Sequence, residues 1–255
     1  MTSLSVTVIT LNEGRNIEAC LASVAWADEI LVVDSGSTDD TVARARAAGA
    51  RVVEREWPGY AAQKNWAAGE VRSDWILSVD ADERVSPALA REIRDVLQGT
   101  PAAVGFRIPR VTWHLGRWIR TTDWYPDHQL RLYNRHHATW RTMRVHESVA
   151  ASGDVAVLTH DLEHYAYRDI SHHLQTMDKY TTLAAAEMFE RGRRAGMVDL
   201  ALHPPAAFLR NYILRRGFLD GAPGFIISAM NAYYVFLKFA KLRALAIDTE
   251  TKDRV

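Results

Sequence analysis

The chain has 255 residues, which is enough for one large α/β domain or for a domain with an appended segment. Its 31 basic and 31 acidic residues give a formal net charge of zero, so no global field favours nucleic acid as a partner. The single cysteine excludes an internal disulfide framework, and the first residues lack the pattern of a secretory signal, which together predict a cytoplasmic protein.

Four short apolar runs in the first part of the chain predict buried strands. These runs are Leu4–Thr10, Glu29–Asp34, Arg51–Glu54 and Trp75–Asp80. Helical spacing of apolar residues lies between them, and Ser86-Pro87 predicts the start of a further helix, with Ser as its N-cap. Because the runs are continuously apolar rather than alternating, they predict a mostly parallel sheet covered by helices on both faces.

Ligands of such a sheet bind beyond the carboxyl ends of its strands. The segments at these ends are Thr10–Glu13, Asp34–Asp39, Glu54–Trp57 and Asp80–Glu83. The pair Asp80-Ala81-Asp82 suits a divalent cation that also binds phosphate oxygens. An acidic loop in solvent would have the same sequence, so the pair alone does not decide its function.

Beyond residue 100 the periodic pattern weakens. Gly105–Arg110 is expected to be a strand, Trp113–Trp140 to be aromatic, basic and irregular, and Ser171–Arg191 to be helical. Nine of the ten histidines lie between residues 114 and 173, a concentration that suits a site rather than plain core.

Three segments in this order, VTVITLNEGRNI, EILVVDSGSTDDTV and AAQKNWAAGEVRSDWILSVDADE, resemble family 2 glycosyltransferases. YPDHQLRLYNR, RVHESV and GFLDG further resemble the branch that contains lipopolysaccharide core glucosyltransferases. The resemblance implies the GT-A fold, an α/β nucleotide-sugar-binding fold with a Rossmann-like sheet and a helical C-terminal segment. It implies a donor-binding half in residues 1–100, an acceptor-binding and catalytic half in 101–200, and a helical, membrane-associated segment in 201–255.

The resemblance also implies roles for residues at the first two strand ends. Thr10 and Glu13 match the segment that lies against the base and ribose of the nucleotide, and Asp34 begins the segment that reads the uracil. Many relatives carry a second Asp where this chain has Ser35. Asp39 could reach the same pocket, although a role at the start of the following helix is the favoured alternative.

Three further residues are expected near the nucleotide sugar. Lys64 matches a basic residue near the phosphates or the base, with a solvated helix face as the alternative. Asp80 is expected on the ribose or uracil side. Arg131 could meet a phosphate through its fork of N–H donors, or form a structural salt bridge.

The resemblance implies a divalent metal ion, Mg²⁺ or Mn²⁺, held by Asp82 between the two phosphates. His164 is a candidate second ligand, and Glu83 is either a supporting residue or a charge at the start of a helix. His160 and His164 also have zinc-like spacing, but their segment lacks the helical pattern of such sites.

An inverting transferase needs a general base that takes the proton of the acceptor hydroxyl. Glu147 and Asp127 are the two candidates, with Glu147 favoured. For each, an ordinary ion pair with a nearby arginine is the alternative.

Residues 204–245 combine apolar stretches with aromatic and basic residues, which suits a helix lying on anionic lipid. A packed helical subdomain or a contact between copies in a homo-oligomer is the alternative.

The expected function is an inverting transfer of a hexose, glucose from UDP-glucose, to a lipid-linked saccharide such as the lipopolysaccharide inner core heptose. The enzyme would then lie on the cytoplasmic face of the inner membrane. A polyprenyl phosphate or exopolysaccharide acceptor, or a non-catalytic nucleotide-sugar-binding scaffold, are the alternatives.

Overall fold

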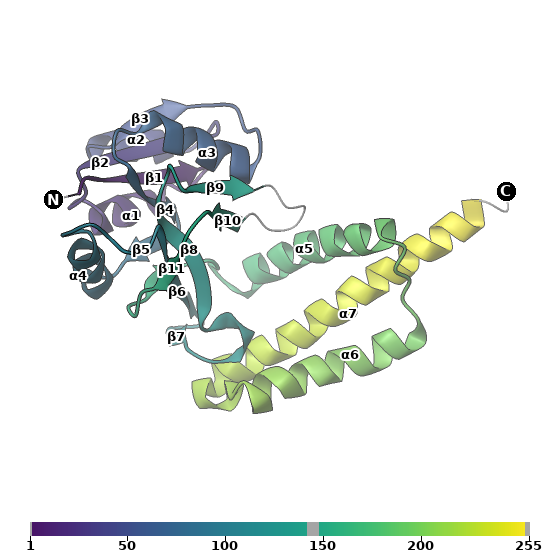
Figure 1. Ribbon diagram of the computed structural model, residues 1–255. Helices are drawn as coiled ribbons and strands as arrows, with labels where there is room; N and C mark the ends of the chain where they lie inside the picture. Colours follow the sequence, from purple (N-terminus) through teal and green to yellow (C-terminus); the bar gives the residue numbers. More distant parts are fainter. Residues whose placement is uncertain (1, 142–147, 253–255) are drawn as a thin grey trace. The chain divides into compact units, whose positions relative to one another are not determined.

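The computed structural model describes residues 2–141 and 148–252 of the chain (Figure 1). It divides into two compact units. Unit 1 comprises Met1–Val111 and Asp127–Tyr165, and unit 2 comprises Thr112–Pro126 and Ala166–Val255.

Four parallel strands form one half of the sheet in unit 1. β1 (Leu4–Thr10) pairs with β2 (Glu29–Asp34) on one side and with β4 (Trp75–Asp80) on the other, and β3 (Arg51–Glu54) pairs with β2. Every residue of β1 is buried, as expected for a strand covered on both faces. The predicted strands and their parallel pairing are confirmed.

Helices cover both faces of this parallel half. They are α1 (Ile17–Ser23), α2 (Thr41–Ala47), α3 (Tyr60–Glu70) and α4 (Pro87–Val96). Alternate residues of β2 enter different cores: Val32 packs in the cluster with α1, α2 and α4, whereas Leu31 and Val33 pack in the cluster with α3. The Ser86 side chain accepts a hydrogen bond from Leu89 N at 3.2 Å, so the predicted cap of α4 is confirmed.

The other half of the sheet is mainly antiparallel. β8 (Asp127–Asn134) lies between β4 and β6 (Gly105–His114) and runs antiparallel to both. The prediction of an irregular Trp113–Trp140 is therefore wrong. Pairing with distant strands, rather than a local apolar pattern, makes this segment extended.

The remaining strands are short and extend or flank this half. They are β5 (Glu83–Val85), β7 (Arg117–Ile119), β9 (Ala138–Arg141), β10 (Ser148–Ala151), β11 (Val155–Val157) and β12 (Leu162–His164). Along the main path the strand order is β3-β2-β1-β4-β8-β6-β12-β5. The α/β class predicted for the fold is confirmed, with an antiparallel half added to the parallel one.

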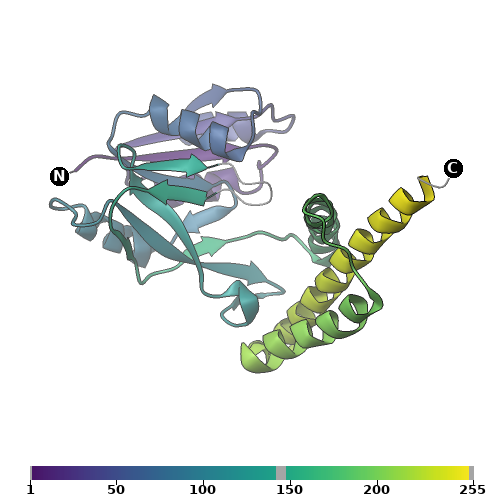
Figure 2. The same cartoon turned by 45° about the vertical axis from the view of Figure 1, so that its right-hand side comes forward.

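Unit 2 is mainly helical. Its α-helices are α5 (Ile170–Glu190), α6 (Met197–Leu209) and α7 (Gly221–Lys252), with single turns η1 (Thr122–Trp124), η2 (Arg210–Leu214) and η3 (Gly217–Asp220). In both views α7 runs alongside α5 and α6 (Figures 1 and 2). Buried Ala185, Phe239 and Leu242 form its core.

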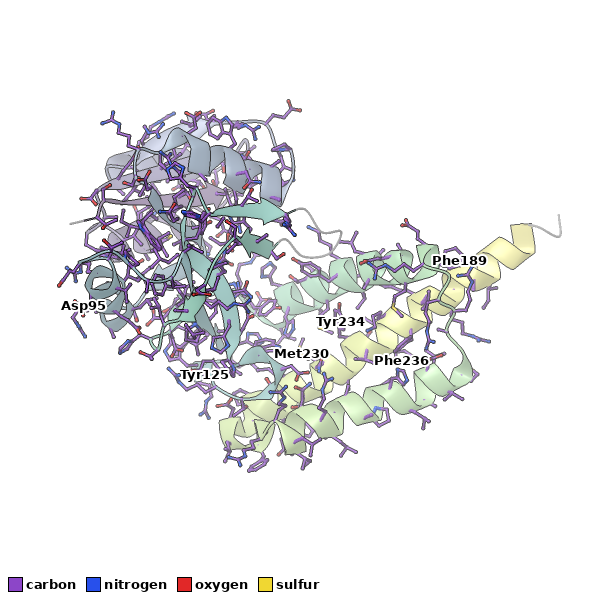
Figure 3. All side chains as sticks on the ribbon, viewed as in Figure 1. Asp95, Tyr125, Phe189, Met230, Tyr234 and Phe236 are labelled. Atoms are coloured by element: carbon purple, nitrogen blue, oxygen red, sulfur yellow. The ribbon has the colours of Figure 1, made fainter. Side chains whose placement is uncertain are left out.

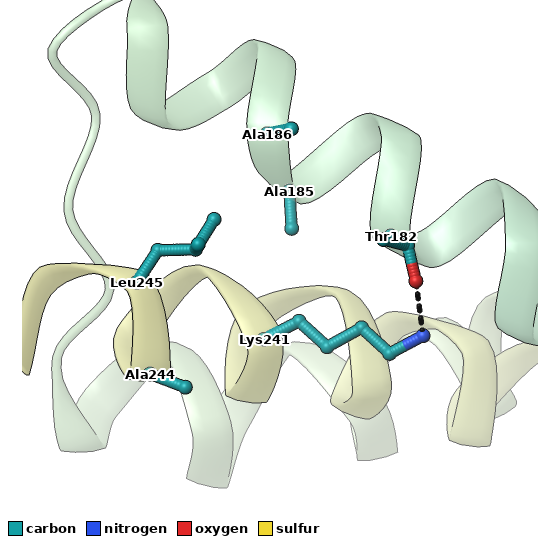
Figure 4. Close-up of a pocket in the computed structure, with 6 residues that line it drawn as sticks. All are labelled: Thr182, Ala185, Ala186, Lys241, Ala244 and Leu245. Atoms are coloured by element: carbon teal, nitrogen blue, oxygen red, sulfur yellow. Dashed lines mark hydrogen bonds between the residues drawn. The ribbon is translucent and has the colours of Figure 1, made fainter. Parts of the chain in front are cut away.

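A polar contact ties α5 to α7 beside a small cleft (Figure 4). The Lys241 ammonium donates to the Thr182 hydroxyl at 2.7 Å and also to Thr181 and Asp178. Within the described part of the chain, one helical stretch, Gly217–Ile247, is long and apolar enough to cross a bilayer by length and composition alone.

Candidate active site

Three strand ends of the parallel half meet at one edge of the unit 1 sheet. Thr10 of β1 is in register with Asp34 of β2, and Ile9 of β1 is in register with Asp80 of β4. Because β1, β2 and β4 run parallel in this register, their polar terminal residues lie near one another. The carboxyl edge that the sequence pattern indicated is therefore formed in the structure.

Asp80 is held by two buried cations. Lys64 Nζ lies 2.9 Å from Asp80 Oδ1, and Arg131 Nη2 donates to Asp80 Oδ2 at 2.5 Å. Burial acts to raise the pKa of Asp80, but the charges of Arg131 and Lys64 outweigh it and lower that pKa well below its ordinary value. Lys64 is only 1% exposed and its ammonium lies 4.3 Å from the centre of the Trp140 ring, so the alternative of a solvated helix face is wrong.

Glu83 is the centre of the same ionic network. Its carboxylate is 0% exposed and accepts from Arg131 Nη2 at 2.7 Å, from Arg110 Nη1 at 3.0 Å and from the Asp80 backbone N–H at 2.9 Å. The interpretation of Glu83 as a charge at the start of a helix is therefore wrong. It is a buried carboxylate that holds the turn after β4, tolerated because its partners supply both charge and hydrogen bonds.

Asp127 forms the ion pair that was the alternative to a catalytic role. Arg110 Nε and Nη2 donate to Asp127 Oδ2 at 3.0 and 2.6 Å, and Gln129 Nε2 donates to Oδ1 at 2.6 Å. Burial acts to raise the pKa of Asp127, but Arg110 outweighs it and the net shift is downward. A carboxylate held in this way is a weaker base than a free one.

Asp82 and His164 form a partly exposed pair. His164 Nε2 lies 3.3 Å from Asp82 Oδ2, and the two side chains are 15% and 27% exposed. Antiparallel pairing of β12 with β5 sets His164 opposite Glu83, and the Tyr165 N–H donates to Asp82 O at 2.9 Å. Burial acts to raise the pKa of Asp82, but His164 outweighs it and the pKa is lowered.

The pair suits a divalent cation only if other ligands complete the shell. Among the residues that the structure describes, no group of three His, Cys, Asp or Glu side chains is arranged to hold a metal. One imidazole and one carboxylate leave positions for the diphosphate oxygens of a nucleotide and for water. His160 and His164, whose spacing resembled that of a zinc site, do not share a site in the structure. His160 Nδ1 binds Glu92 at 2.8 Å, whereas His164 faces Asp82.

Thr10 and Glu13 stand at and just after the end of β1. Thr10 is 5% exposed, and its buried hydroxyl has no hydrogen-bond partner in the described parts of the chain. Glu13 accepts from Asn16 Nδ2 at 2.8 Å. Burial raises the pKa of Glu13, and the nearby charges of Asp82 and Asp39 act in the same direction.

The acidic side chains at the second strand end shape the loop itself. Asp34 accepts from the backbone N–H groups of Gly36 and Ser37 at 2.9 and 2.8 Å, and from the Ser37 hydroxyl. Asp39 accepts from Gly14 N at 3.1 Å and from Thr41 N at 3.0 Å, which joins the loops after β1 and β2. Asp39 thus lies just before the N-cap residue of α2, Asp40, and ties the loop to the first residue of that helix.

The other candidate base, Glu147, lies outside the described residues. Sequence reasoning missed Arg110, Trp140 and the contact that Asn65 makes with Trp140. Asn65 Oδ1 accepts from Trp140 N at 2.8 Å and its Nδ2 donates to Trp140 O at 2.8 Å, which places the Trp140 ring beside Lys64. Only the Lys64-Asn65 pair was visible in the sequence; nothing local marks Arg110, which reaches Glu83 across 27 residues.

Residues 5–151 match the family described as Glycosyl transferase family 2. The chain is 32% identical over 246 residues to lipopolysaccharide core biosynthesis glycosyltransferase LpsC of Rhizobium meliloti, covering 94% of this chain and 91% of that protein. An uncharacterized glycosyltransferase of Rickettsia bellii is 32% identical over 98% of this chain and 90% of its own length.

A shorter likeness exists to glucosyl-3-phosphoglycerate synthase of Mycobacterium tuberculosis. The sequences are 49% identical over 59 residues, which cover 21% of this chain and 18% of that protein. A crystal structure of that enzyme with Mn²⁺, UDP and glucosyl-3-phosphoglycerate overlays with a TM-score of 0.37 at 29% identity, and covers 44% of each chain.

Proposed function

Because the chain belongs to glycosyl transferase family 2, we propose that it is an inverting enzyme that moves glucose from UDP-glucose to a membrane-bound acceptor, such as the inner core heptose of lipopolysaccharide. The likeness to LpsC over most of both chains supports the acceptor class. The shorter match to a glucosyl-transferring synthase supports the sugar. The observation that carries the proposal is the partly exposed Asp82–His164 pair beside the aligned strand ends.

Residues 1–100 would bind the donor, residues 101–200 would supply acceptor contacts and the base, and 201–255 would associate with the membrane. In the donor half, Thr10, Glu13 and Asp34 would lie along the base and ribose. The unpaired buried hydroxyl of Thr10 supports this, because a buried donor without a partner is costly.

Asp82 and His164 would hold Mg²⁺ or Mn²⁺. When bound, the cation offsets the negative charge that develops on the departing diphosphate. Asp80 takes a different part, because Lys64 and Arg131 already occupy both of its oxygens. Asp80 would hold these two cations at the edge of the sheet where the nucleotide binds. The positive charges of Lys64 and Arg131 would then stabilise the negative phosphates through their electrostatic field.

We assign the general base to Glu147. The base accepts the proton of the acceptor hydroxyl as that oxygen bonds to the anomeric carbon and the bond to UDP breaks on the opposite face. The Arg110 pair lowers the pKa of the competing Asp127, which makes Asp127 the poorer proton acceptor. Glu147→Gln is therefore expected to lower turnover by about 100-fold or more with donor binding kept.

The same assay decides between the two carboxylates. Asp127→Asn is expected to change turnover much less than Glu147→Gln does, apart from any loss of folded protein. If Asp127→Asn gives the large loss while Glu147→Gln is nearly as active as the wild type, the assignment is reversed.

The main experiment measures UDP release from a panel of sugar nucleotides, with Mg²⁺, Mn²⁺ or a chelator, and with core-truncated lipopolysaccharide as acceptor. We expect release with UDP-glucose, dependent on metal and acceptor. Asp82→Asn should abolish it, whereas Asp95→Asn, an exposed carboxylate on α4 (Figure 3), should not. Turnover only with a polyprenyl phosphate would change the acceptor, and unchanged cellular function of Asp82→Asn would favour a non-catalytic scaffold.

A further inference from the structure

The outward face of α6 in unit 2 is apolar where a helix facing water would be polar. Met197 and Val198 are each 66% exposed, Leu202 is 61% exposed and Leu209 is 57% exposed. Val198, Leu202 and Leu209 are four and seven residues apart, so they lie on one face of the helix. Exposed Pro205 falls on the same face. The opposite face, which includes buried Ala207, is turned inward.

The apolar surface continues through the turns that follow α6. Ile213 and Leu214 of η2 are 50% and 76% exposed, and Phe218 and Leu219 of η3 are 46% and 59% exposed. Arg216, between the two turns, has a positive φ of 56°. The outer α6 surface is defined here as the exposed apolar residues of this region: Met197, Val198, Leu202, Leu209, Ile213, Leu214, Phe218 and Leu219.

Positive charge borders this surface. Between residues 197 and 220, which span the surface, there are three arginines and two acidic residues, Asp199 and Asp220. Asp199 is neutralised by its pair with Arg193. Asp220 is only 3% exposed, and it pairs with Arg117 and accepts from the Thr121 hydroxyl. Asp123 contacts both Arg210 and Arg215, one carboxylate for two guanidinium groups. The net charge beside the apolar surface is therefore positive.

An exposed apolar surface of this extent needs a partner, unlike single exposed leucines. Leu174 and Leu183 of α5 are 41% and 44% exposed, but they stand among exposed polar residues. A second copy of the chain is a poor partner, because a symmetric contact would bring the same arginines together. An anionic lipid surface satisfies both features, since acyl chains take the apolar side chains and headgroups take the arginines.

We propose that the outer α6 surface binds anionic lipid, with α6 in the plane of the interface and Leu214 and Leu219 in the acyl region. Arg215 and Arg216 then meet the headgroups. This lipid-binding surface rests on the proposed function, because a membrane-bound acceptor gives the contact its purpose. It adds to that function the surface used and the charge of the lipid. It assigns the contact to α6 and the η2–η3 turns rather than to the whole segment after residue 204.

The test is flotation of the full-length protein with vesicles of phosphatidylcholine, alone or mixed with phosphatidylglycerol. Wild type is expected to float only with the anionic vesicles, and less at high salt. The double variant Leu202→Glu with Leu214→Glu should bind at least about 10-fold more weakly. Leu174→Glu with Leu183→Glu on α5 is the matched control and should bind as the wild type does.

Three results would overturn the proposal. The first is wild-type flotation of the α6 variant, and the second is an equal loss in the α5 control. The third is a change from dimer to monomer in the α6 variant with flotation unchanged, which would make the surface an interface between copies. Because Leu202 and Leu214 are mostly in solvent, circular dichroism of the α6 variant should match the wild type.

Flotation needs neither donor nor acceptor, so its outcome is independent of the proposed reaction. The α6 variant should still release UDP with detergent-dispersed acceptor. If flotation behaves as expected while no acceptor supports turnover, the reaction is wrong and the lipid surface stands.

Discussion

The two units depart from the usual division of charged and apolar residues in opposite ways. Unit 1 gathers six charged side chains in one network, of which Lys64, Glu83 and Arg131 are buried, and unit 2 exposes many apolar side chains. The network consists of Lys64, Arg110, Arg131, Asp80, Glu83 and Asp127. Three positive and three negative charges compensate each other inside unit 1, whereas the outer α6 surface has no such compensation within its unit. A buried ionic network is therefore a structural support, while an exposed apolar surface calls for an external partner.

The substitution with the largest expected effect tests whether the ionic network stabilises unit 1. Arg131→Met removes one cation from two carboxylates, Asp80 and Glu83. We expect a loss of about 3–5 kcal/mol in the free energy of unfolding, because buried charge is left unpaired. Urea unfolding followed by hydrogen exchange of unit 1 peptides measures it. Arg107→Met, at an exposed position of β6, should change stability by less than about 0.5 kcal/mol. Equal effects in the two variants would show that the network carries no stability.

The substitution with the next largest expected effect tests whether unit 2 is tightly packed beneath its apolar surface. A Cβ at Gly224 of α7 would lie 1.8 Å from the backbone oxygen of Gly217. Backbone cannot rotate away as a side chain can, so Gly224→Ala should destabilise unit 2 by about 3 kcal/mol. Gly69→Ala in α3, where nothing lies within 4 Å of the added Cβ, is the control and should be neutral or slightly stabilising. A neutral Gly224→Ala would mean that this end of unit 2 is loosely packed.

Acid should affect the two units at different pH values. Burial lowers the pKa of His173 from 6.5 to about 4, and it lowers the pKa of His114 as well. The unfolded chain therefore binds more protons between these values, and unit 2 should lose up to about 1.4 kcal/mol per pH unit as pH falls from 6.5 to 4. Asp80 and Asp127 have lowered pKa values, so their stabilising contribution to unit 1 is lost only below the ordinary carboxyl value of 3.8.

Hydrogen exchange of peptides from each unit at pH 7 and pH 5 measures this difference. His173→Phe should reduce the pH dependence of unit 2. If unit 1 opens first on acidification, the buried histidines do not govern the acid response.

The smallest effect concerns the contact that ties α5 to α7. Lys241→Met keeps most of the aliphatic chain but loses the hydrogen bonds to α5, and we expect a loss of about 1 kcal/mol in unit 2. Lys179→Met, at an exposed position of α5, is the control and should be close to neutral. Thermal unfolding of the two variants side by side checks the difference. Identical midpoints would assign the cohesion of α5 and α7 to apolar packing alone.

Much of the parallel half could be predicted from the sequence, because its signals are local. The bounds of β1, β2, β3 and β4 follow from apolar runs that turn polar at their ends, and the start of α4 follows from Ser86-Pro87. The place of Asp80 and Asp82 at the carboxyl edge follows in turn from parallel pairing. The antiparallel half escaped prediction, because β8 is defined by pairing with β4 and β6 rather than by a pattern of its own.

The sequence by itself determined the family, the bounds and parallel direction of the strands in the parallel half, and the segments at their ends. Tertiary structure alone decided which charges meet: Arg131 reaches Asp80 across 51 residues, and His164 reaches Asp82 only because β12 pairs with β5. It also decided that α6 turns its leucines outward, since composition sets how apolar a helix is but packing sets which face is left exposed. The physical reason is range: caps and apolar runs act within a few residues, whereas ion pairs and exposure depend on neighbours that only the folded chain brings together.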